Sequence, residues 1–342
     1  MPIVRPRKLM PRHSPCLLLI GFYALPQLQS GVGATLRSFP CSGSYEAKTM
    51  KHALIAALAI FLSAGAASAA PAKQYTGPII DTHAHIRLDD DDGISGAIPP
   101  HPLGTDALRK LDDDASVVES ALIVIARKDQ MERTRTQNDA VLASAAASGG
   151  RFYAVVSVHP ADGAAALLEL ERVAKLGAKE VKLHPNTQNF DVTDPPVGAV
   201  VEKCGELGMA VLFDSYKPWD ASEMGKLLLL AVQHPKTKLV LAHMGFTHFR
   251  EAVSFELIRR LGMAENVWFD ISAIANTYAG SPVQDELVWT IRKVGTDRVL
   301  FGTDWPVYTP AETVKAVRQM KFTYAEQKQI FHDNAARLFG LT

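Results

Sequence analysis

The chain has 342 residues, with 36 basic and 36 acidic side chains, so its formal net charge at pH 7 is zero. This balance argues against the basic surface that proteins use to bind nucleic acid. The length is enough for one large domain with its own hydrophobic core, and three cysteines are too few for a disulfide-dense scaffold.

Residues 50–69 have the three parts of a secretory signal peptide. A short basic start at Met50-Lys51-His52 precedes the apolar run at 53–66, and small residues follow at 67–69. The apolar run is too short to span a bilayer comfortably. We therefore expect cleavage after Ala69 and a periplasmic or secreted protein.

Residues 1–49 show no sustained periodicity, and a signal peptide normally begins at the N-terminus. We expect them to be a disordered upstream extension that is not native, with translation starting at Met50. The alternative is a single membrane anchor, because residues 16–28 are also apolar. After cleavage only Cys204 remains, acidic residues outnumber basic ones, and the protein is expected to be soluble with no membrane contact.

Short apolar runs recur along residues 70–342 and alternate with segments of helical spacing, a pattern typical of parallel βα units. Eight runs are expected to be strands, and they lie at 77–86, 120–127, 152–160, 178–185, 208–216, 238–245, 266–273 and 298–306. Helix candidates include 163–177, 196–208, 222–235, 283–295, 310–320 and 323–339.

Eight parallel strands, each followed by a helix, predict an α/β fold: a single-domain (β/α)8 TIM barrel over residues 70–342, in which closure removes the sheet edges. The alternative is an open doubly wound sheet, but no glycine-rich phosphate loop follows the first strand. The acidic run at 89–93 lacks the alternating ligands of a calcium loop, and we interpret it as a solvated loop at the barrel mouth.

The active site of such a barrel lies at the C-terminal ends of its strands. On the first strand, His83 and His85 share one face because side chains alternate, so both imidazoles can bind one ion. Asp81 has the same parity. It is expected either to accept a hydrogen bond from a ligand imidazole or to be a buried structural acceptor.

Further polar residues end the later strands. Lys182 and His184 share a face of the fourth strand, Asp214 ends the fifth, His243 the sixth and Asp304 the eighth. Lys182 inside a barrel needs a partner or access to water. His184 is open to three interpretations, as a metal ligand, a substrate-binding residue or a loop residue before Pro185. His159 is interpreted as a loop residue, and Asp270 as a structural hydrogen-bond acceptor at the mouth.

The first and eighth strands are neighbours in a closed barrel, which brings His83, His85 and Asp304 together as candidate metal ligands. His243 lies across the mouth, where it can take a proton from water or stabilise a developing oxyanion.

With these residues the chain resembles the amidohydrolase superfamily, and within it the branch that includes aminocarboxymuconate-semialdehyde-type decarboxylases. The matching segments run in order from about residue 77 to 341, and they are "DTHAHI", "VKLHP", "LVLAHMG", "FGTDWP" and "HDNAARLFGL". The resemblance implies a TIM barrel, a divalent ion on His83, His85 and Asp304, and hydrolysis or nonoxidative decarboxylation of small carboxylated substrates.

One position departs from the family pattern. Many members have a metal-binding histidine at the end of the fifth strand, where this chain has Asp214. Asp214 is therefore either a ligand or a water-orienting base. Alternatively, His184 completes the shell, or the site binds metal weakly or not at all. One ion is expected, zinc first and manganese second, because carboxylates suit both. A carboxylated Lys182 bridging two ions is less favoured without the accompanying histidine.

The leading hypothesis is a metal-dependent hydrolase that activates water against a small carboxylate, ester, lactone or amide, with His243 and Asp304 as catalytic residues. Lys182, His184 and Trp305 are the candidate substrate-binding residues. The alternatives are a metal-dependent decarboxylase and a non-catalytic ligand-binding barrel with a degraded site. A small molecule is the expected partner in each case.

Overall fold

The computed structural model describes residues 73–88 and 104–341, all of which belong to the compact unit Ser68–Thr342. The predictions for the upstream extension at 1–49, the signal peptide at 50–69 and the acidic run at 89–93 lie outside the described residues. Among those described, no helix is both long enough and apolar enough to cross a membrane.

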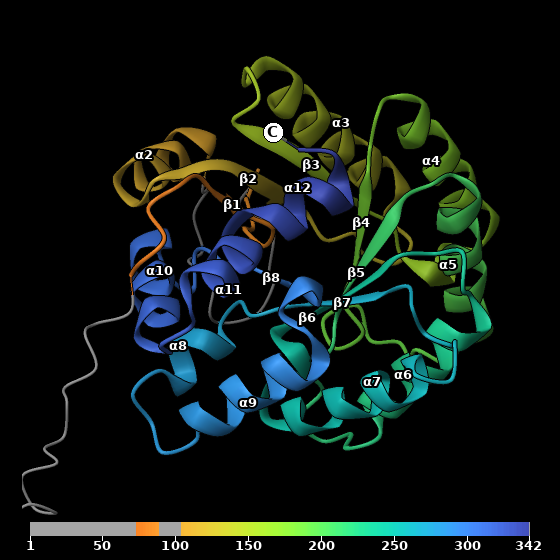
Figure 1. The fold of residues 1–342 in the computed structure, drawn as a ribbon. Coiled ribbons are helices and arrows are strands. Elements are labelled where there is room, and N and C mark those ends of the chain that lie inside the picture. Colours follow the sequence, from red (N-terminus) through yellow and green to blue (C-terminus); the bar gives the residue numbers. More distant parts are fainter. Residues whose placement is uncertain (1–72, 89–103, 342) are drawn as a thin grey trace, which may run out of the picture. The chain divides into compact units, whose positions relative to one another are not determined.

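Eight parallel strands form one sheet in sequence order (Figure 1). The strands are β1 Ile79–Asp81, β2 Val117–Ile123, β3 Phe152–Ser157, β4 Glu180–Leu183, β5 Ala210–Asp214, β6 Leu239–Ala242, β7 Val267–Asp270 and β8 Val299–Leu300. Each lies within or overlaps a predicted run, so the predicted eight parallel strands of a TIM-barrel-like α/β fold are confirmed.

Backbone hydrogen bonds connect the segments that follow β1 and β8, the first and last strands of the sheet. Thr82 N donates to Phe301 O (2.9 Å), and His85 N donates to Trp305 O (2.8 Å). Asp304 N donates in turn to His83 O (2.7 Å). The two ends of the sheet therefore meet where the candidate metal ligands lie.

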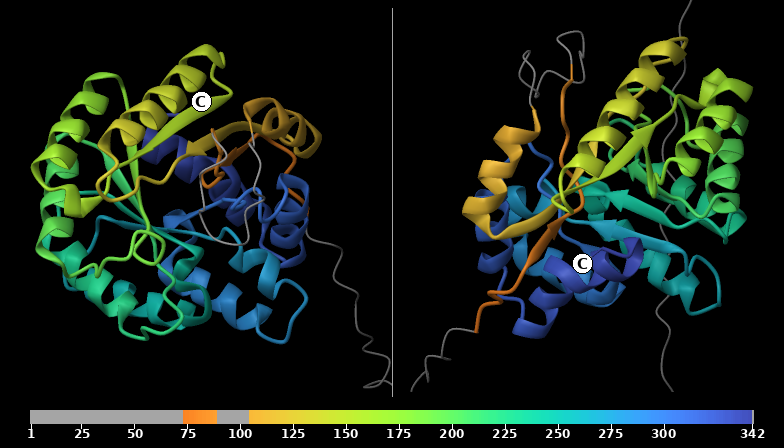
Figure 2. Two further views of the ribbon diagram at one scale, coloured as in Figure 1. Left: turned by 180° about the vertical axis from the view of Figure 1, so that it is seen from behind. Right: turned by 90° about the horizontal axis from the view of Figure 1, so that it is seen from above.

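Helices surround the sheet in all three views (Figures 1 and 2). They are α2 Thr105–Ala115, α3 Met131–Ala147, α4 Ala164–Lys175, α5 Pro195–Glu206, α6 Glu223–Gln233, α7 Ala252–Arg259, α8 Ile274–Tyr278, α9 Gln284–Val294, α10 Pro310–Gln319, α11 Tyr324–Lys328 and α12 Asn334–Phe339. Of these, α4, α5, α6, α9 and α10 correspond to the predicted ranges, and α2, α3, α7 and α8 were not among them.

Local sequence explains the placement of these helices. In α4 the buried residues Ala166, Leu170 and Val173 follow the three-to-four-residue spacing that puts apolar side chains on one face. Thr309 and Glu312 form a reciprocal capping box that starts α10, with Pro310 at its first position. The range 323–339, predicted as one helix, is interrupted by a π-helical segment at Gln329–Asp333 between α11 and α12.

The core has two layers. Apolar residues between the sheet and the helices form the larger cluster. A smaller cluster contains inward residues of successive strands, such as Ile80, Val155 and Leu212, together with Leu338 and Phe339 of α12. Lys179 and Lys238, which directly precede β4 and β6, donate to the carbonyls of Phe339 and Leu338. The α12 helix therefore fills the N-terminal end of the strand bundle, opposite the candidate site.

This packing predicts the effect of shortening Phe339, which is 6% exposed and stacks on Tyr153 at a centroid distance of 5.6 Å. Phe339→Ala should lower the free energy of unfolding by about 3 kcal/mol, because it removes a large buried ring and leaves a cavity. Urea denaturation measures the change. The control Leu261→Ala, at a side chain 70% exposed, should have almost no effect. Equal stability of the two variants would contradict the packing described.

Candidate metal centre and active site

Three side chains from the ends of β1 and β8 converge. His83 Nε2 lies 3.1 Å from His85 Nε2, and each of these nitrogens is 3.5 Å from Asp304 Oδ1. His83 and His85 are buried and Asp304 is nearly so. Two donors that each lie about 2.1 Å from one ion are separated by roughly 3.0–3.4 Å in tetrahedral or octahedral geometry. The spacing and the nitrogen and oxygen chemistry of this group both fit one divalent cation.

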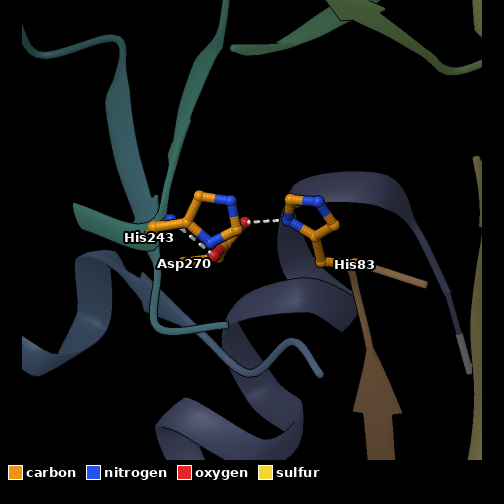
Figure 3. Close-up of side chains that lie close together, drawn as sticks. All are labelled: His83, His243 and Asp270. Atoms are coloured by element: carbon orange, nitrogen blue, oxygen red, sulfur yellow. Dashed lines mark hydrogen bonds and ion pairs between the residues drawn. The ribbon is translucent and has the colours of Figure 1, made fainter. Parts of the chain in front are cut away.

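Asp270, at the end of β7, orients the first of these imidazoles (Figure 3). His83 Nδ1 lies 2.9 Å from Asp270 Oδ2, and an ionised carboxylate only accepts, so the proton is on Nδ1 and the lone pair is on Nε2. Asp270 Oδ1 accepts from the backbone of His243 and from Ser272. The predicted acceptor role of Asp270 is confirmed, and its ligand-orienting position is the one usual for a metal-bound histidine.

Asp81 does not have the imidazole contact that its parity suggested. Its carboxylate accepts from the backbone of His83 (2.9 Å) and from Thr303 N and Oγ1 (3.0 and 2.6 Å). Strand β1 ends at Asp81, and a bend at Thr82 interrupts the alternation of side chains. Asp81 is therefore a buried structural hydrogen-bond acceptor, as one of the two predictions had it. The other prediction, that Asp81 accepts a hydrogen bond from a ligand imidazole, is wrong.

Electrostatics keeps the three candidate ligands in the forms that bind metal. Burial, reinforced by the charge of Lys182, lowers the pKa of His83 to about 4, and burial also lowers the pKa of His85. Burial alone would raise the pKa of Asp304, but the charge of His243 and the neighbouring rings of His85 and His83 bring it to about 2. At neutral pH the imidazoles of His83 and His85 are therefore neutral and the Asp304 carboxyl group is ionised. These are the protonation states in which the three side chains can bind a divalent ion.

His243 reaches the site through an unusual backbone. Alternation of side chains along β6 would put His243 on the same face as Leu239 and Leu241, which pack in the larger cluster between the sheet and the helices. Instead, His243 has φ 58°, and the next three residues also have positive φ. Left-handed conformations of non-glycine residues cost about 1 kcal/mol or more each and are concentrated at functional sites. The turn leaves Nδ1 donating to Ser272 O (3.0 Å) and Nε2 3.3 Å from Asp214 Oδ2.

His243 and Asp214 form an ion pair. Burial alone would lower the pKa of His243, but the hydrogen bond with Asp214 and the charge of Asp304 raise it to about 9. Burial opposes ionisation of Asp214 as well, yet His184 and His243 hold the pKa of that carboxyl well below its usual range. His243 is therefore an imidazolium at neutral pH beside an ionised Asp214.

Asp214 lies outside the group formed by His83, His85 and Asp304. Its Oδ2 faces two histidines, His243 at 3.3 Å and His184 at 3.5 Å. His184 Nδ1 accepts a hydrogen bond from Thr187 N (3.3 Å), so in the neutral ring the proton is on Nε2, which points to Asp214. In this arrangement His184 is a hydrogen-bond donor and its Nε2 has no lone pair for a metal.

Lys182 is fully buried, and its Nζ lies 3.2 Å from His83 Nε2. Burial lowers the pKa of Lys182, while the charges of Asp214, Asp270 and Asp304 oppose this decrease. The ammonium group thus lies among carboxylates that compensate for part of its desolvation.

A second group of possible ligands in the described residues consists of His83, His243 and Asp270. Hydrogen bonds already account for this group, because Asp270 binds the His83 ring and the His243 backbone (Figure 3). Trp305 and His159 belong to neither group. Trp305 is buried in the core and His159 caps a short helical turn. The structure also reveals Ser272, which no strand pattern predicted, between Asp270 and His243.

Comparisons with known proteins agree with this geometry. Residues 80–341 match the sequence profile of the family described as amidohydrolase. The chain belongs to the amidohydrolase family. Members of this superfamily are metal-dependent enzymes, so the resemblance read from the five motifs is confirmed, and this amidohydrolase is an enzyme. Its enzyme homologues act on small molecules.

Individual relatives of this amidohydrolase are distant. It is 24% identical over 220 residues to the 4-sulfomuconolactone hydrolase of Hydrogenophaga intermedia, an alignment covering 59% of this chain and 70% of the relative. A dihydroxybenzoic acid decarboxylase structure from Polaromonas sp., with bound manganese, superposes with a TM-score of 0.63 and 18% identity, covering 77% of this chain and 97% of that one. The 5-carboxyvanillate decarboxylase structure from Sphingomonas paucimobilis superposes with a TM-score of 0.60 and 19% identity, covering 78% of this chain and 99% of that one.

Gly302 allows the segment after β8 to approach the His83 side chain, and this close contact is testable. A Cβ at position 302 would lie 2.8 Å from His83 Cβ and 3.1 Å from Ser272 Cβ. Gly302→Ala should therefore displace His83 and weaken Mn²⁺ or Zn²⁺ binding by about tenfold or more, as do changes that disturb ligand orientation. Isothermal titration calorimetry measures the affinity.

The matched control is Gly225→Ala in α6, where a Cβ would have no heavy atom within 4 Å. This variant should bind the metal as the unmodified protein does, with unchanged or slightly higher stability, because alanine is the better helix former. Unaltered metal affinity in Gly302→Ala would show that the position of His83 does not depend on this contact.

Proposed function

We propose that this amidohydrolase is an exported, metal-dependent hydrolase of small carboxylated esters, lactones or amides. The observation that carries the proposal is the spacing of 3.1–3.5 Å among His83 Nε2, His85 Nε2 and Asp304 Oδ1. This spacing suits one ion with part of its coordination sphere open to water and substrate. Export rests on the signal-like residues 50–69 alone.

Zinc is proposed first and manganese second, because two imidazoles and a carboxylate suit both ions. When bound, such an ion lowers the pKa of water and polarises a carbonyl group. His83 and His85 would hold it through Nε2, and Asp304 through a carboxylate oxygen. The hydrogen bond of His83 to Asp270 fixes the lone pair that this requires.

His243 has the charge and position to stabilise negative charge on a substrate oxygen. It is an imidazolium whose Nδ1 is held by Ser272 O, so its Nε2–H points toward Asp214 and the interior of the site. A fixed cation in a buried site stabilises a developing oxyanion without reorganising at the moment of reaction. Asp304, which is ionised, is proposed to accept the proton of the attacking water.

Asp214 is proposed to orient His243 and His184 rather than to complete the metal shell. Its carboxylate oxygen lies within 3.5 Å of both rings, and it does not belong to the group that fits a metal. The Nε2–H of His184 is then available to a substrate oxygen when the substrate displaces it from Asp214. Lys182 and Trp305 remain proposed contributors to substrate binding.

A decarboxylase is the second candidate, and the solved structures support it. Several that resemble this fold are named as decarboxylases of hydroxybenzoates or 5-carboxyvanillate. The curated relative found by sequence is named as a hydrolase. The same site residues serve either reaction, because an ionised substrate carboxylate and a scissile carbonyl both bind a cationic centre.

Metal content and product identity test the proposal together. The purified protein should bind about one Zn²⁺ or Mn²⁺ per chain, measured by inductively coupled plasma mass spectrometry, and chelation should abolish turnover. The ester, lactone or amide substrate should be converted to its carboxylic acid product, and no CO2 should be released. His83→Ala should lose the metal and reduce the rate by at least about a thousandfold, whereas Lys175→Ala, at an exposed position of α4, should do neither.

Trapped CO2 from a hydroxybenzoate would select decarboxylation instead. If no divalent ion binds at micromolar concentration and His83→Ala changes neither metal content nor rate, the protein is not a metal-dependent enzyme. A non-catalytic ligand-binding barrel would then be the better account.

The ion pair of His243 also predicts a pH dependence. Its pKa is about 9 in the folded protein, against an ordinary value of 6.5 for a histidine side chain, so the folded state holds more protons between these two values. Its contribution to stability is complete below pH 6.5 and is lost as the pH rises through about 9. Buried Asp81 and Glu180, with pKa values raised by burial to about 7 and about 8, contribute a slope of the same sign.

The variant His243→Gln separates these contributions. The unfolding free energies of the unmodified protein and of His243→Gln are measured by urea denaturation of the metal-free proteins between pH 6.5 and 9.5. The difference between the two should shrink by up to about 3 kcal/mol as the pH rises. A difference that is constant across this range would mean that His243 is neutral throughout.

A further inference from the structure

Three aromatic side chains form a contiguous group beside His243. The ring centroid of Phe246 is 6.4 Å from that of His243, with an angle of 86° between the ring planes. Tyr216 lies on one side of Phe246, at a centroid distance of 4.8 Å, and Tyr278 of α8 lies 6.4 Å from it. Because Tyr216 and Phe246 follow the C-terminal ends of β5 and β6, the group is at the same end of the sheet as the candidate metal ligands.

These three side chains, which we call the aromatic wall, are anchored on one side and accessible on another. Tyr216, Phe246 and Tyr278 are all half-buried. The fully buried Phe249 lies 5.7 Å from Tyr278 and connects the wall to the core. The backbone N of Tyr216 donates to Asp214 Oδ1 (3.2 Å), which connects the wall to the partner of His243. Each ring therefore keeps part of its surface free for contact while its position is fixed.

The backbone of Phe246 is the most unusual feature of the wall. Its φ is 49° and its ψ is −110°. Met244, with φ 48° and ψ 33°, is in the left-handed helical region that non-glycine residues sometimes adopt, but Phe246 lies outside that region. The conformation of Phe246 is one that glycine adopts readily and a bulky residue does not. Strained conformations of this kind are concentrated at ligand-binding and catalytic sites.

Neighbouring contacts hold the turn that carries Phe246. Gly245 N donates to Ser215 Oγ (2.9 Å), and Ser215 Oγ donates to Ala242 O, so the segments after β5 and β6 are joined. A Cβ at Gly245 would lie 2.8 Å from Met224 Sδ, which shows how closely the turn packs on α6. Packing at the edge of the core gives no reason for a bulky residue at a glycine-like backbone position. Placement of an aromatic ring beside His243 does.

We propose that Phe246 and Tyr216 bind the flat face of an unsaturated or aromatic ring in the substrate, and that Phe246 is the specificity-determining residue. The inference rests on the proposed function, because a ring beside His243 contacts the substrate only if His243 faces the reacting group. Aromatic side chains stack offset or edge-to-face on planar rings and gain energy beyond the burial of area. The substrate is thereby narrowed to one whose reacting group is part of a planar ring or is attached to one.

Two probes of equal charge separate ring planarity from hydrophobic area. Benzoate and cyclohexanecarboxylate have the same number of carbon atoms, and area alone would favour the saturated ring, which has more apolar surface. Calorimetric titration of the full-length protein should show benzoate bound at least about threefold more tightly. Phe246→Leu, which keeps an apolar side chain at this position, should remove the preference.

The control for this variant is Tyr324→Leu. Tyr324 is 39% exposed, and its ring centroid lies 5.6 Å from that of Tyr75, which precedes β1. The substitution removes an aromatic contact outside the wall and should leave the preference for benzoate unchanged.

The backbone strain is tested without a ligand. Phe246→Gly and Phe246→Ala both remove the ring, but only glycine fits φ 49° and ψ −110° without strain. Urea denaturation should therefore give a higher midpoint for Phe246→Gly than for Phe246→Ala. At Leu229, which is 51% exposed in α6, the same pair of substitutions should show the opposite order, because alanine is the better helix former.

Equal affinities for the two probes would overturn the inference. So would a preference that survives Phe246→Leu, an equal loss in Tyr324→Leu, no benzoate binding at millimolar concentration, or a Phe246→Ala variant as stable as Phe246→Gly. Metal content and product analysis decide the proposed function separately. A preference that depends on Phe246 without metal or turnover supports the aromatic wall on a non-catalytic barrel, whereas turnover with no dependence on Phe246 removes the wall alone.

Discussion

The hydrogen bond between His83 Nδ1 and Asp270 Oδ2 is the interaction on which the candidate site depends. It determines which nitrogen of His83 bears the lone pair, and that nitrogen is the one near His85, Asp304 and Lys182. Asp270 can serve in this way because four donors satisfy its two oxygens, which keeps it ionised although it is completely buried. The same carboxylate holds the backbone of His243, so one acidic side chain positions both halves of the site.

Charge balance is the second constraint. Asp214, Asp270 and Asp304 are held ionised in a buried region, opposed by the imidazolium of His243 and by Lys182. Buried charges are tolerated when they are paired and hydrogen-bonded, and the pairs here are arranged around His83 and Asp214. A divalent cation would add positive charge where carboxylates and neutral imidazoles converge. Binding of a metal and stability of the interior are therefore linked in this protein.

Much of this arrangement follows from strand periodicity. Alternation places His83 beside His85, the order of the strands brings Asp304 to them, and Asp270 ends a strand in the same way. Periodicity fails where the backbone leaves the strand geometry. The bend at Thr82 turns Asp81 to the backbone, and positive φ angles from His243 to Phe246 set a ring direction that no pattern encodes. The contacts of Ser272 with Asp270 and His243 depend on tertiary packing, and a serine at this position does not signal them in the sequence.

The meeting of the first and last strands has a consequence for how the protein acquires its metal. Thr303 donates to the carbonyl of His83 across 220 residues of sequence, and the candidate ligands come from the same two segments. Contacts so distant in the chain form late, because a long loop must close before they are made. The binding group cannot exist in a nascent or truncated chain that lacks β8. Metal capture would then report that the chain has been synthesised through the segment after β8 and that this segment has met the one after β1, and it would withhold activity from products that lack either segment.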